Sequence, residues 1–209
     1  MKKVGIGCLV ALVVVGLLVV VGSRIAINRV KGFVGEVQQL TEISQLDAQV
    51  QNRQSYQPAA DQPLTETQVM RYVGIQRAML ARLGERVKGL DAKYQQVSAQ
   101  RGDRDLTFRE MMEVWRDMVD LIVEAKRAQV EALNAAGMSL AEYNWVRAQV
   151  LISLGHGFGA FDISSLASGE PFAEPAGIPP VAVRQKNLEL LKPHLDTAED
   201  WLPLSFFGL

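Results

Sequence analysis

The hydrophobic and polar positions divide the chain into one long uncharged run and a series of segments with helical periodicity. The run extends from Val4 to Gly22 and contains no charged residue. At roughly 1.5 Å of rise per residue, a helix of this length spans about 28 Å, close to the ~30 Å hydrocarbon core of a bilayer. The pattern therefore predicts a single transmembrane helix.

Two other interpretations of this run require its removal from the mature protein. A cleaved secretory signal has a shorter apolar region, of about 7 to 15 residues, than the one seen here. A lipoprotein signal would use Cys8, but the apolar stretch follows this cysteine instead of preceding it. We therefore interpret residues 1–23 as a retained anchor in membrane lipid.

The charges beside the run are nearly balanced, so the positive-inside rule does not fix the orientation. Lys2 and Lys3 precede the run, whereas Arg24, Arg29 and Lys31 follow it. A short basic head before an apolar stretch is typical of an uncleaved export signal. We therefore favour a domain on the extracytoplasmic, periplasmic side.

Two segments of different character follow the anchor. Residues 24–50 place apolar side chains at spacings of three and four, which predicts an amphipathic juxtamembrane helix interrupted by Gly32 and Gly35. Residues 51–63 are polar and contain Pro58 and Pro63, a composition that indicates a linker.

Residues 64–209 contain three helix starts of the same design. In each, a hydroxyl residue is followed three positions later by Glu or Gln, the pattern of a capping box. The pairs are Thr65 with Gln68, Thr107 with Glu110, and Ser139 with Glu142. Together with a later helical segment, they predict an all-α fold with a small bundle of about four helices.

The first two of these helices carry complementary patterns. One apolar seam extends from Val69 to Val97 in the first, and Gln76 is its sole polar member. The second helix, from about Thr107 to Ala135, has an acidic stripe and apolar residues elsewhere, which predicts a mostly buried helix with the stripe as its solvent edge. The first helix is basic, so an antiparallel hairpin would bring opposite charges together at the rim. The stripe comprises Glu110, Glu113, Asp117, Asp120 and Glu124.

The remaining helices are predicted from glycine and proline residues, which end or interrupt helices, as much as from apolar periodicity. The third helix extends from Ser139 to about Leu154 and ends at the glycine-rich residues 154–159. The last extends from about Val181 to Trp201, and Pro193 inside it should kink or divide it. The apolar residues 201–209 must dock on the domain, touch the membrane or meet a partner.

Composition excludes several function classes. The chain has 209 residues and a formal net charge of -1, which argues against a dominant electrostatic role toward nucleic acid. Its only cysteine, Cys8, lies in the predicted span, so internal disulfides, thiolate metal sites and a soluble cysteine nucleophile are excluded.

No motif with specific chemistry emerges. A di-iron bundle would require Glu-x-x-His pairs, and Ser153 and Leu191 stand three residues before His156 and His194. His156 also lacks an accompanying nucleophile, phosphate or dinucleotide motif, so a helix C-cap loop is the plain interpretation of its surroundings. We predict no catalytic residue, cofactor or metal.

Candidate interaction residues come from the third helix and the C-terminal segment. Aromatic residues and arginine are enriched at binding hot spots. The alternative is that the aromatic residues of the third helix pack in the core and its arginine reaches past them to solvent. The candidates are Tyr143, Trp145, Arg147, His156, Trp201, Phe206 and Phe207.

The favoured hypothesis is a non-catalytic, membrane-anchored helical interaction or scaffold module of a bacterial-type envelope, with membrane lipid and an unidentified protein as its partners. A first alternative is a methionine-rich bundle that binds lipid or another hydrophobic ligand. A second is an enzyme that uses His156 with a carboxylate such as Asp162. The sequence indicates neither the partner nor the oligomeric state.

Overall fold

The computed structural model describes residues 42–43, 45–59, 61–101, 107–156, 178–206 and 208–209. The predicted span at residues 4–22 and most of the predicted juxtamembrane helix lie outside this part of the chain. Within it, no helix combines the length and the apolar character that crossing a bilayer requires.

All regular elements of the described residues are helical, so the prediction of an all-α bundle is confirmed. Pro193 lies in a 3-10 helix that divides the predicted last helix, which is why there are more elements than the four expected. The elements are α3 (Glu66–Arg101), α4 (Phe108–Ala136), α5 (Leu140–Ser153), α6 (Val181–Leu191), the 3-10 helix η4 (Lys192–Thr197) and α7 (Ala198–Phe206).

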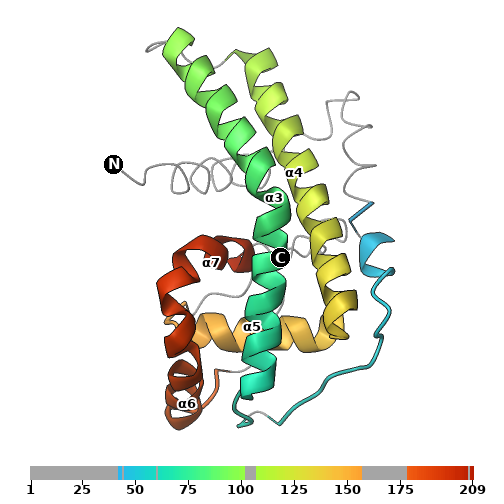
Figure 1. Cartoon of the computed structure of the whole chain (residues 1–209), viewed down its shortest axis with the longest axis vertical. Helices are drawn as coiled ribbons and strands as arrows, with labels where there is room; N and C mark the ends of the chain where they lie inside the picture. Colours follow the sequence, from blue (N-terminus) through green and yellow to red (C-terminus); the bar gives the residue numbers. More distant parts are fainter. Residues whose placement is uncertain (1–41, 44, 60, 102–106, 157–177, 207) are drawn as a thin grey trace, which may run out of the picture.

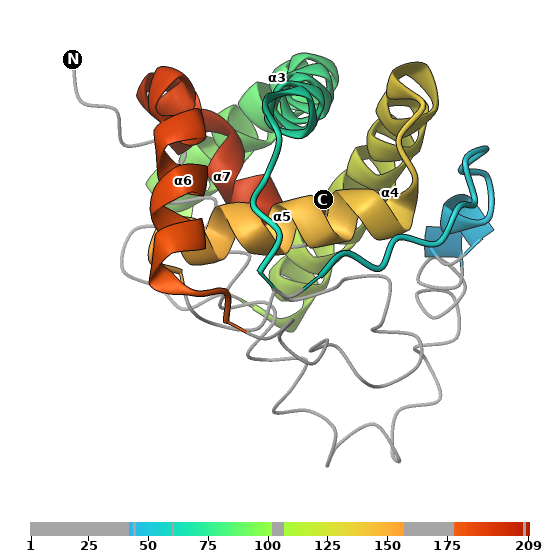
Figure 2. The ribbon, with the colours of Figure 1, turned by 90° about the horizontal axis from the view of Figure 1, so that it is seen from below.

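Helices α3 and α4 form a long antiparallel hairpin, and the shorter helices gather at one end of it (Figure 1). Helix α5 crosses the base of the hairpin, and α6 and α7 pack beside α3. The view from below shows α5 bridging from α4 to α6 (Figure 2). The opposite end of the hairpin therefore extends well beyond the other helices.

Two of the three predicted capping boxes are complete. Gln68 and Thr65 exchange hydrogen bonds at the start of α3, and Thr107 and Glu110 do so at the start of α4. At the start of α5, Ser139 accepts from the amide of Glu142, but the Glu142 carboxylate instead accepts from Gln68 Nε2 at 3.0 Å. The third pair is therefore half a box, because its acid joins the first turns of α3 and α5.

Glycine at a left-handed position ends two of the helices. Gly137 has a φ of 64° after α4, and Gly155 has a φ of 87° after α5. In the second case the amide of His156 donates to the carbonyl of Leu151 at 2.9 Å, which satisfies a carbonyl in the last turn. His156 thus lies in the C-cap loop expected from its glycine neighbours.

We use two names for the regions of this structure. The arm is residues 84–101 of α3 with residues 108–117 of α4, and the body is the remaining described helices with residues 42–64. No arm side chain that the structure describes is buried. The body contains the core, which includes Val73, Met79, Leu133, Met138, Tyr143, Val146, Val150 and Trp201. Among the first ten residues of α4, the seven whose side chains the structure describes are not buried, so the burial predicted for the second helix is found in its later part.

The described residues of the segment 42–64 lie against the helices of the body. Ile43, Leu46 and Val50 are buried in the core, and Asp47 forms an ion pair with Lys126 of α4 at 2.6 Å. The segment predicted as a linker begins with a hydrogen bond from the amide of Gln51 to Asn134 Oδ1 at 2.8 Å, on the last turn of α4. These contacts fasten the segment to the base of the hairpin.

Candidate functional site

Five buried polar side chains from three helices converge inside the body, and we call them the polar centre. Tyr72 and Gln76 come from α3, Gln129 comes from α4, and Tyr143 and Arg147 come from α5. None of the five is more than 3% exposed. A buried polar group is costly unless it is hydrogen-bonded, so the partners of these side chains matter.

Most of those partners belong to the segment 204–209 at the end of α7. Gln76 Nε2 donates to the main-chain oxygen of Leu209, and Gln129 Nε2 donates to that of Gly208, each at 2.9 Å. Arg147 Nη1 lies 3.5 Å from the main-chain oxygen of Ser205. The polar centre therefore holds this segment chiefly through its main chain.

The polar centre also has contacts of its own. Gln76 Nε2 lies 2.6 Å from the Tyr143 hydroxyl, and the hydroxyls of Tyr72 and Ser205 lie 2.5 Å apart. Tyr72 packs against Tyr143 with ring centroids 5.4 Å apart, and meets Trp201 edge to face at 5.9 Å. An aromatic wall thus flanks the polar groups and excludes water from them.

The two buried phenols stay neutral. Burial raises the pKa of Tyr72 to about 12, although the Ser205 hydrogen bond and the charge of Arg147 act in the opposite direction. Burial, reinforced by Tyr72, holds the pKa of Tyr143 well above its ordinary value of 10.0. At neutral pH both phenols keep their protons and contribute to the polar centre as neutral hydroxyl groups.

The structure brings together three of the predicted interaction residues at this site. Tyr143 and Arg147 are members of the polar centre, and Trp201 covers one side of it. The alternative that Arg147 reaches past the aromatic residues to solvent is wrong, because its side chain is buried against the end of α7.

The other candidates lie elsewhere. The rings of His156 and Phe206 meet edge to face with centroids 5.0 Å apart, at the end of α5. Trp145 packs against Tyr56, which lies in the segment predicted as a linker, with ring centroids 5.3 Å apart. Phe207, like Asp162, lies outside the described residues.

Sequence reasoning did not select four residues of this site, namely Tyr72, Gln76, Gln129 and Ser205. One signal for them was present, since Gln76 is the only polar residue in the apolar seam of α3. A polar residue at such a position is expected to have a buried partner. Gln76 has two such partners, Tyr143 at 67 positions away in the chain and Leu209 at 133.

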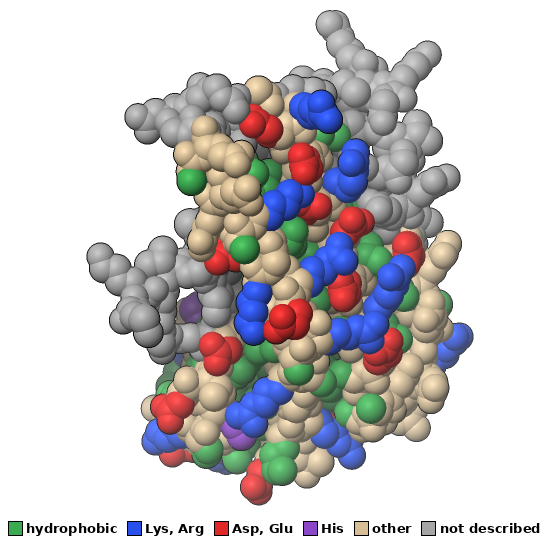
Figure 3. All heavy atoms as spheres, turned by 45° about the horizontal axis from the view of Figure 1, so that its top comes forward, with side chains coloured by type: hydrophobic (Ala, Val, Ile, Leu, Met, Phe, Trp, Pro, Cys, Tyr) green, Lys and Arg blue, Asp and Glu red, His purple; other side chains and the backbone are tan. Residues whose placement is uncertain are grey.

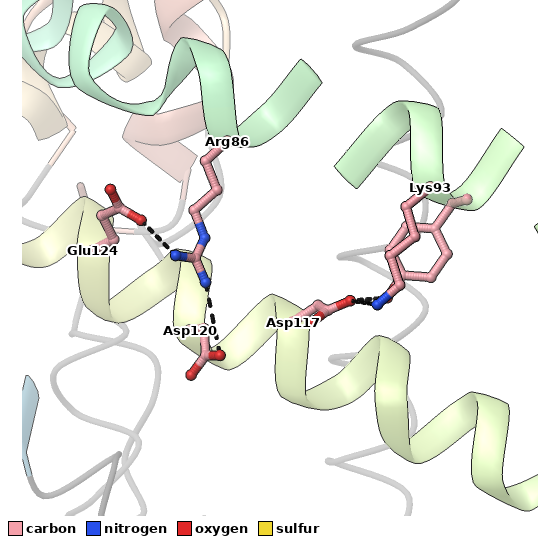
Figure 4. A network of polar contacts seen from close by, with 6 residues as sticks. Arg86, Lys93, Asp117, Asp120 and Glu124 are labelled. Carbon is pink, nitrogen blue, oxygen red and sulfur yellow. Dashed lines mark hydrogen bonds and ion pairs between the residues drawn. The ribbon is translucent and has the colours of Figure 1, made fainter. Parts of the chain in front are cut away.

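A second polar arrangement joins the two helices of the hairpin where the arm begins. Arg86 of α3 lies 3.0 Å from Glu124 and 3.7 Å from Asp120 of α4 (Figure 4). Basic and acidic side chains alternate along this face (Figure 3). The predicted opposition of a basic and an acidic helix is confirmed. Four residues of the acidic stripe form ion pairs with α3 at a rim that is still partly exposed to solvent, namely Glu113, Asp117, Asp120 and Glu124.

Further along the arm, Asp117 accepts from both Lys93 Nζ at 2.5 Å and Tyr94 Oη at 2.7 Å. Lys93 Nζ also lies 2.7 Å from Glu113. Hydrogen bonds to Asp117 and Glu113 raise the pKa of Lys93. Desolvation acts to raise the pKa of Asp117, but the bonds from Lys93 and Tyr94 outweigh it and hold that pKa below the ordinary value. Both groups therefore remain charged across the neutral range.

The described residues contain no group of three or more His, Cys, Asp or Glu side chains able to hold a metal ion. No family model, curated protein or solved structure matches the chain.

Proposed function

We propose that this chain is a non-catalytic, membrane-anchored interaction module whose arm is the surface that meets a protein partner. Residues 4–22 hold the chain in membrane lipid, and the domain lies on the extracytoplasmic side of a bacterial-type envelope. The arm supports this proposal more than any other feature, because it extends two helices beyond the core without burying a described side chain.

The surface chemistry of the arm is suited to recognition of a protein. Its apolar side chains, among them Val87, Leu90 and Val97, are half-buried along the seam between the helices. Charged side chains of both signs border that seam, and their ion pairs hold the two helices in register. An apolar centre bordered by a polar, solvent-accessible rim is the usual anatomy of a protein interface.

Site-specific photocrosslinking in intact membranes tests this proposal. A photoreactive amino acid is placed at Ala92 in the arm and, as a matched control, at Gln185 in α6, both exposed positions. We expect a discrete adduct of one mass from the arm position and none of that mass from the α6 position. The same set of adducts from both positions, or none from Ala92, contradicts the proposal.

A topology reporter fused after Leu209 tests the side of the membrane separately. We expect activity from a reporter that functions only in the periplasm, and none from one that requires the cytoplasm. The opposite result contradicts the proposed location without affecting the role of the arm, because the crosslinking experiment does not depend on orientation.

A further inference from the structure

The described residues of the segment 204–209 contact the polar centre chiefly through their main-chain oxygens. Three of its main-chain oxygens, those of Ser205, Gly208 and Leu209, face buried donors of the polar centre. Among the described side chains of the segment, only that of Ser205 has a polar contact there, with Tyr72. A site that reads the main chain accepts more than one sequence, provided that the backbone has the right shape.

Two buried acceptors of the polar centre have no hydrogen-bond partner, which is a second, independent observation. Gln76 Oε1 and Gln129 Oε1 are unpaired, although both side chains are 0% exposed. A carboxamide offers a donor and an acceptor, and here each glutamine uses only its donor. The unused oxygens are able to accept hydrogen bonds from main-chain N–H groups, which the present occupant does not supply.

The occupant also depends on a glycine turn at the end of α7, of the same kind that ends α4 and α5. Gly208 has a φ of 82°, in the left-handed region, and the amide of Leu209 donates back to the carbonyl of Leu204 at 3.2 Å. This turn points the oxygens of Gly208 and Leu209 at the two glutamines. A residue with a side chain rarely adopts such a φ, so glycine is required here.

We propose that the polar centre is a peptide-binding site that the chain's own residues 204–209 occupy as a self-ligand. Its other occupant is an apolar segment of a partner protein with a small hydroxyl residue three positions before a glycine, the arrangement of Ser205 and Gly208. Binding of the partner segment requires release of residues 204–209, so the two compete. This site is separate from the arm, and the inference stands whether or not the arm binds a protein.

Competition for the site is tested with a labelled peptide of sequence LSFFGL that carries solubilising lysines at its amino end. It is titrated against the full chain in lipid nanodiscs, with empty nanodiscs as the blank. Gly208→Ala in the chain strains the self-ligand and raises the fraction of open sites. We expect roughly tenfold tighter apparent binding to this variant, since apparent affinity scales with the open fraction.

Two matched controls show whether the site itself is responsible. Gly89→Ala in the arm, where a Cβ meets no atom within 4 Å, should leave peptide binding unchanged. A peptide with Ala in place of its Gly should bind Gly208→Ala chains at least about tenfold more weakly. Adding Gln129→Leu to Gly208→Ala should abolish the gain while the helical circular dichroism is retained.

Three results would overturn the proposal. One is unchanged peptide binding after Gly208→Ala when hydrogen exchange shows that residues 204–209 have been released. Another is equal binding of the glycine and alanine peptides. The third is a Gly208→Ala chain that dimerises in light scattering without binding peptide, which would show exchange of the segment between two copies. If Gly208→Ala fails to fold, Ser205→Ala replaces it, because it removes the Tyr72 contact without straining the backbone.

Discussion

The arm and the body are built from the same two helices, yet different interactions hold them. In the body, α3 packs against α4, α5 and α7 around fully buried residues such as Leu133 and Tyr143. In the arm, α3 meets only α4 among the described helices, and solvated ion pairs such as Lys93 with Asp117 border a half-buried seam. A continuous helix can thus belong to two regions of very different local stability.

The arm and the body therefore differ in how well they tolerate changes of sequence. A dense core resists change, because removal of one methylene is felt by its neighbours. A two-helix arm with rim charges has little buried area, so its surface can vary without loss of the fold. We infer that the body fixes the position of the arm while the arm is free to serve recognition.

The largest effect is expected from truncating an aromatic residue of the body. Trp201→Ala removes a side chain that is 1% exposed and should lower the free energy of unfolding by about 3–5 kcal/mol. Val87→Ala at a half-buried arm position should cost roughly 1 kcal/mol or less. Chemical denaturation of both variants measures the comparison, and equal losses would remove the distinction between arm and body.

Breaking an ion pair should cost more stability in the body than in the arm. Lys126 is 1% exposed, and its Nζ forms an ion pair with Asp47 Oδ1 at 2.6 Å. Asp47→Ala leaves a buried charge without its counterion and should cost about 3 kcal/mol, whereas Arg86→Ala in the solvated network should cost ~1 kcal/mol or less. The double variant Asp47→Ala with Lys126→Met should regain most of the loss. A cost of Arg86→Ala equal to that of Asp47→Ala would be inconsistent with this account.

Replacing a glycine by alanine should lower the free energy of unfolding in the body and raise it in the arm. Gly137→Ala forces a side chain into a φ of 64° at the end of α4 and should destabilise the chain by about 1–2 kcal/mol. Gly89→Ala lies within the arm helix, where an added Cβ has open space, and should stabilise that helix by roughly 0.5–1 kcal/mol. Thermal unfolding compares the two, and destabilisation by Gly89→Ala would show that the arm is not a regular, solvent-facing helix.

The smallest effect is a pH dependence confined to the arm. Because the pKa of Asp117 is lower in the folded chain than its ordinary 3.8, its contribution is present above about pH 4 and is lost as pH falls through the lowered value. We expect faster exchange of arm amides below pH 4, after correction for the intrinsic rate. Asp117→Asn should weaken the acid dependence of exchange in the arm. The same exchange profile in this variant as in the unchanged chain would show that other carboxylates cause the dependence.

Local features of the fold were predictable from sequence because their causes are local. Thr65 and Thr107 begin helices through contacts with residues three positions away, and Pro193 divides a helix by its own covalent geometry. The charge patterns of α3 and α4 predicted which faces meet, since opposite charges at helical spacing had to lie at a shared rim.

The polar centre was not predictable in the same way. Its parts come from α3, α4, α5 and residues 205–209, and no local rule places Gln129 opposite Gly208, 79 positions later. Glu142 shows the converse case. Its spacing from Ser139 predicted a local capping contact, but its carboxylate contacts Gln68 of another helix instead. Tertiary contacts decide between local options that the sequence leaves nearly equal in free energy.

Native-state hydrogen exchange of the full chain, followed over increasing denaturant, tests the division between arm and body most directly. We expect amides of residues 84–101 and 108–117 to exchange through a low-energy opening that depends weakly on denaturant. Amides of residues 69–83, 118–133 and 143–151 should exchange only with global unfolding, at a single higher free energy. Exchange of both sets at the same free energy and with the same denaturant dependence would contradict the account.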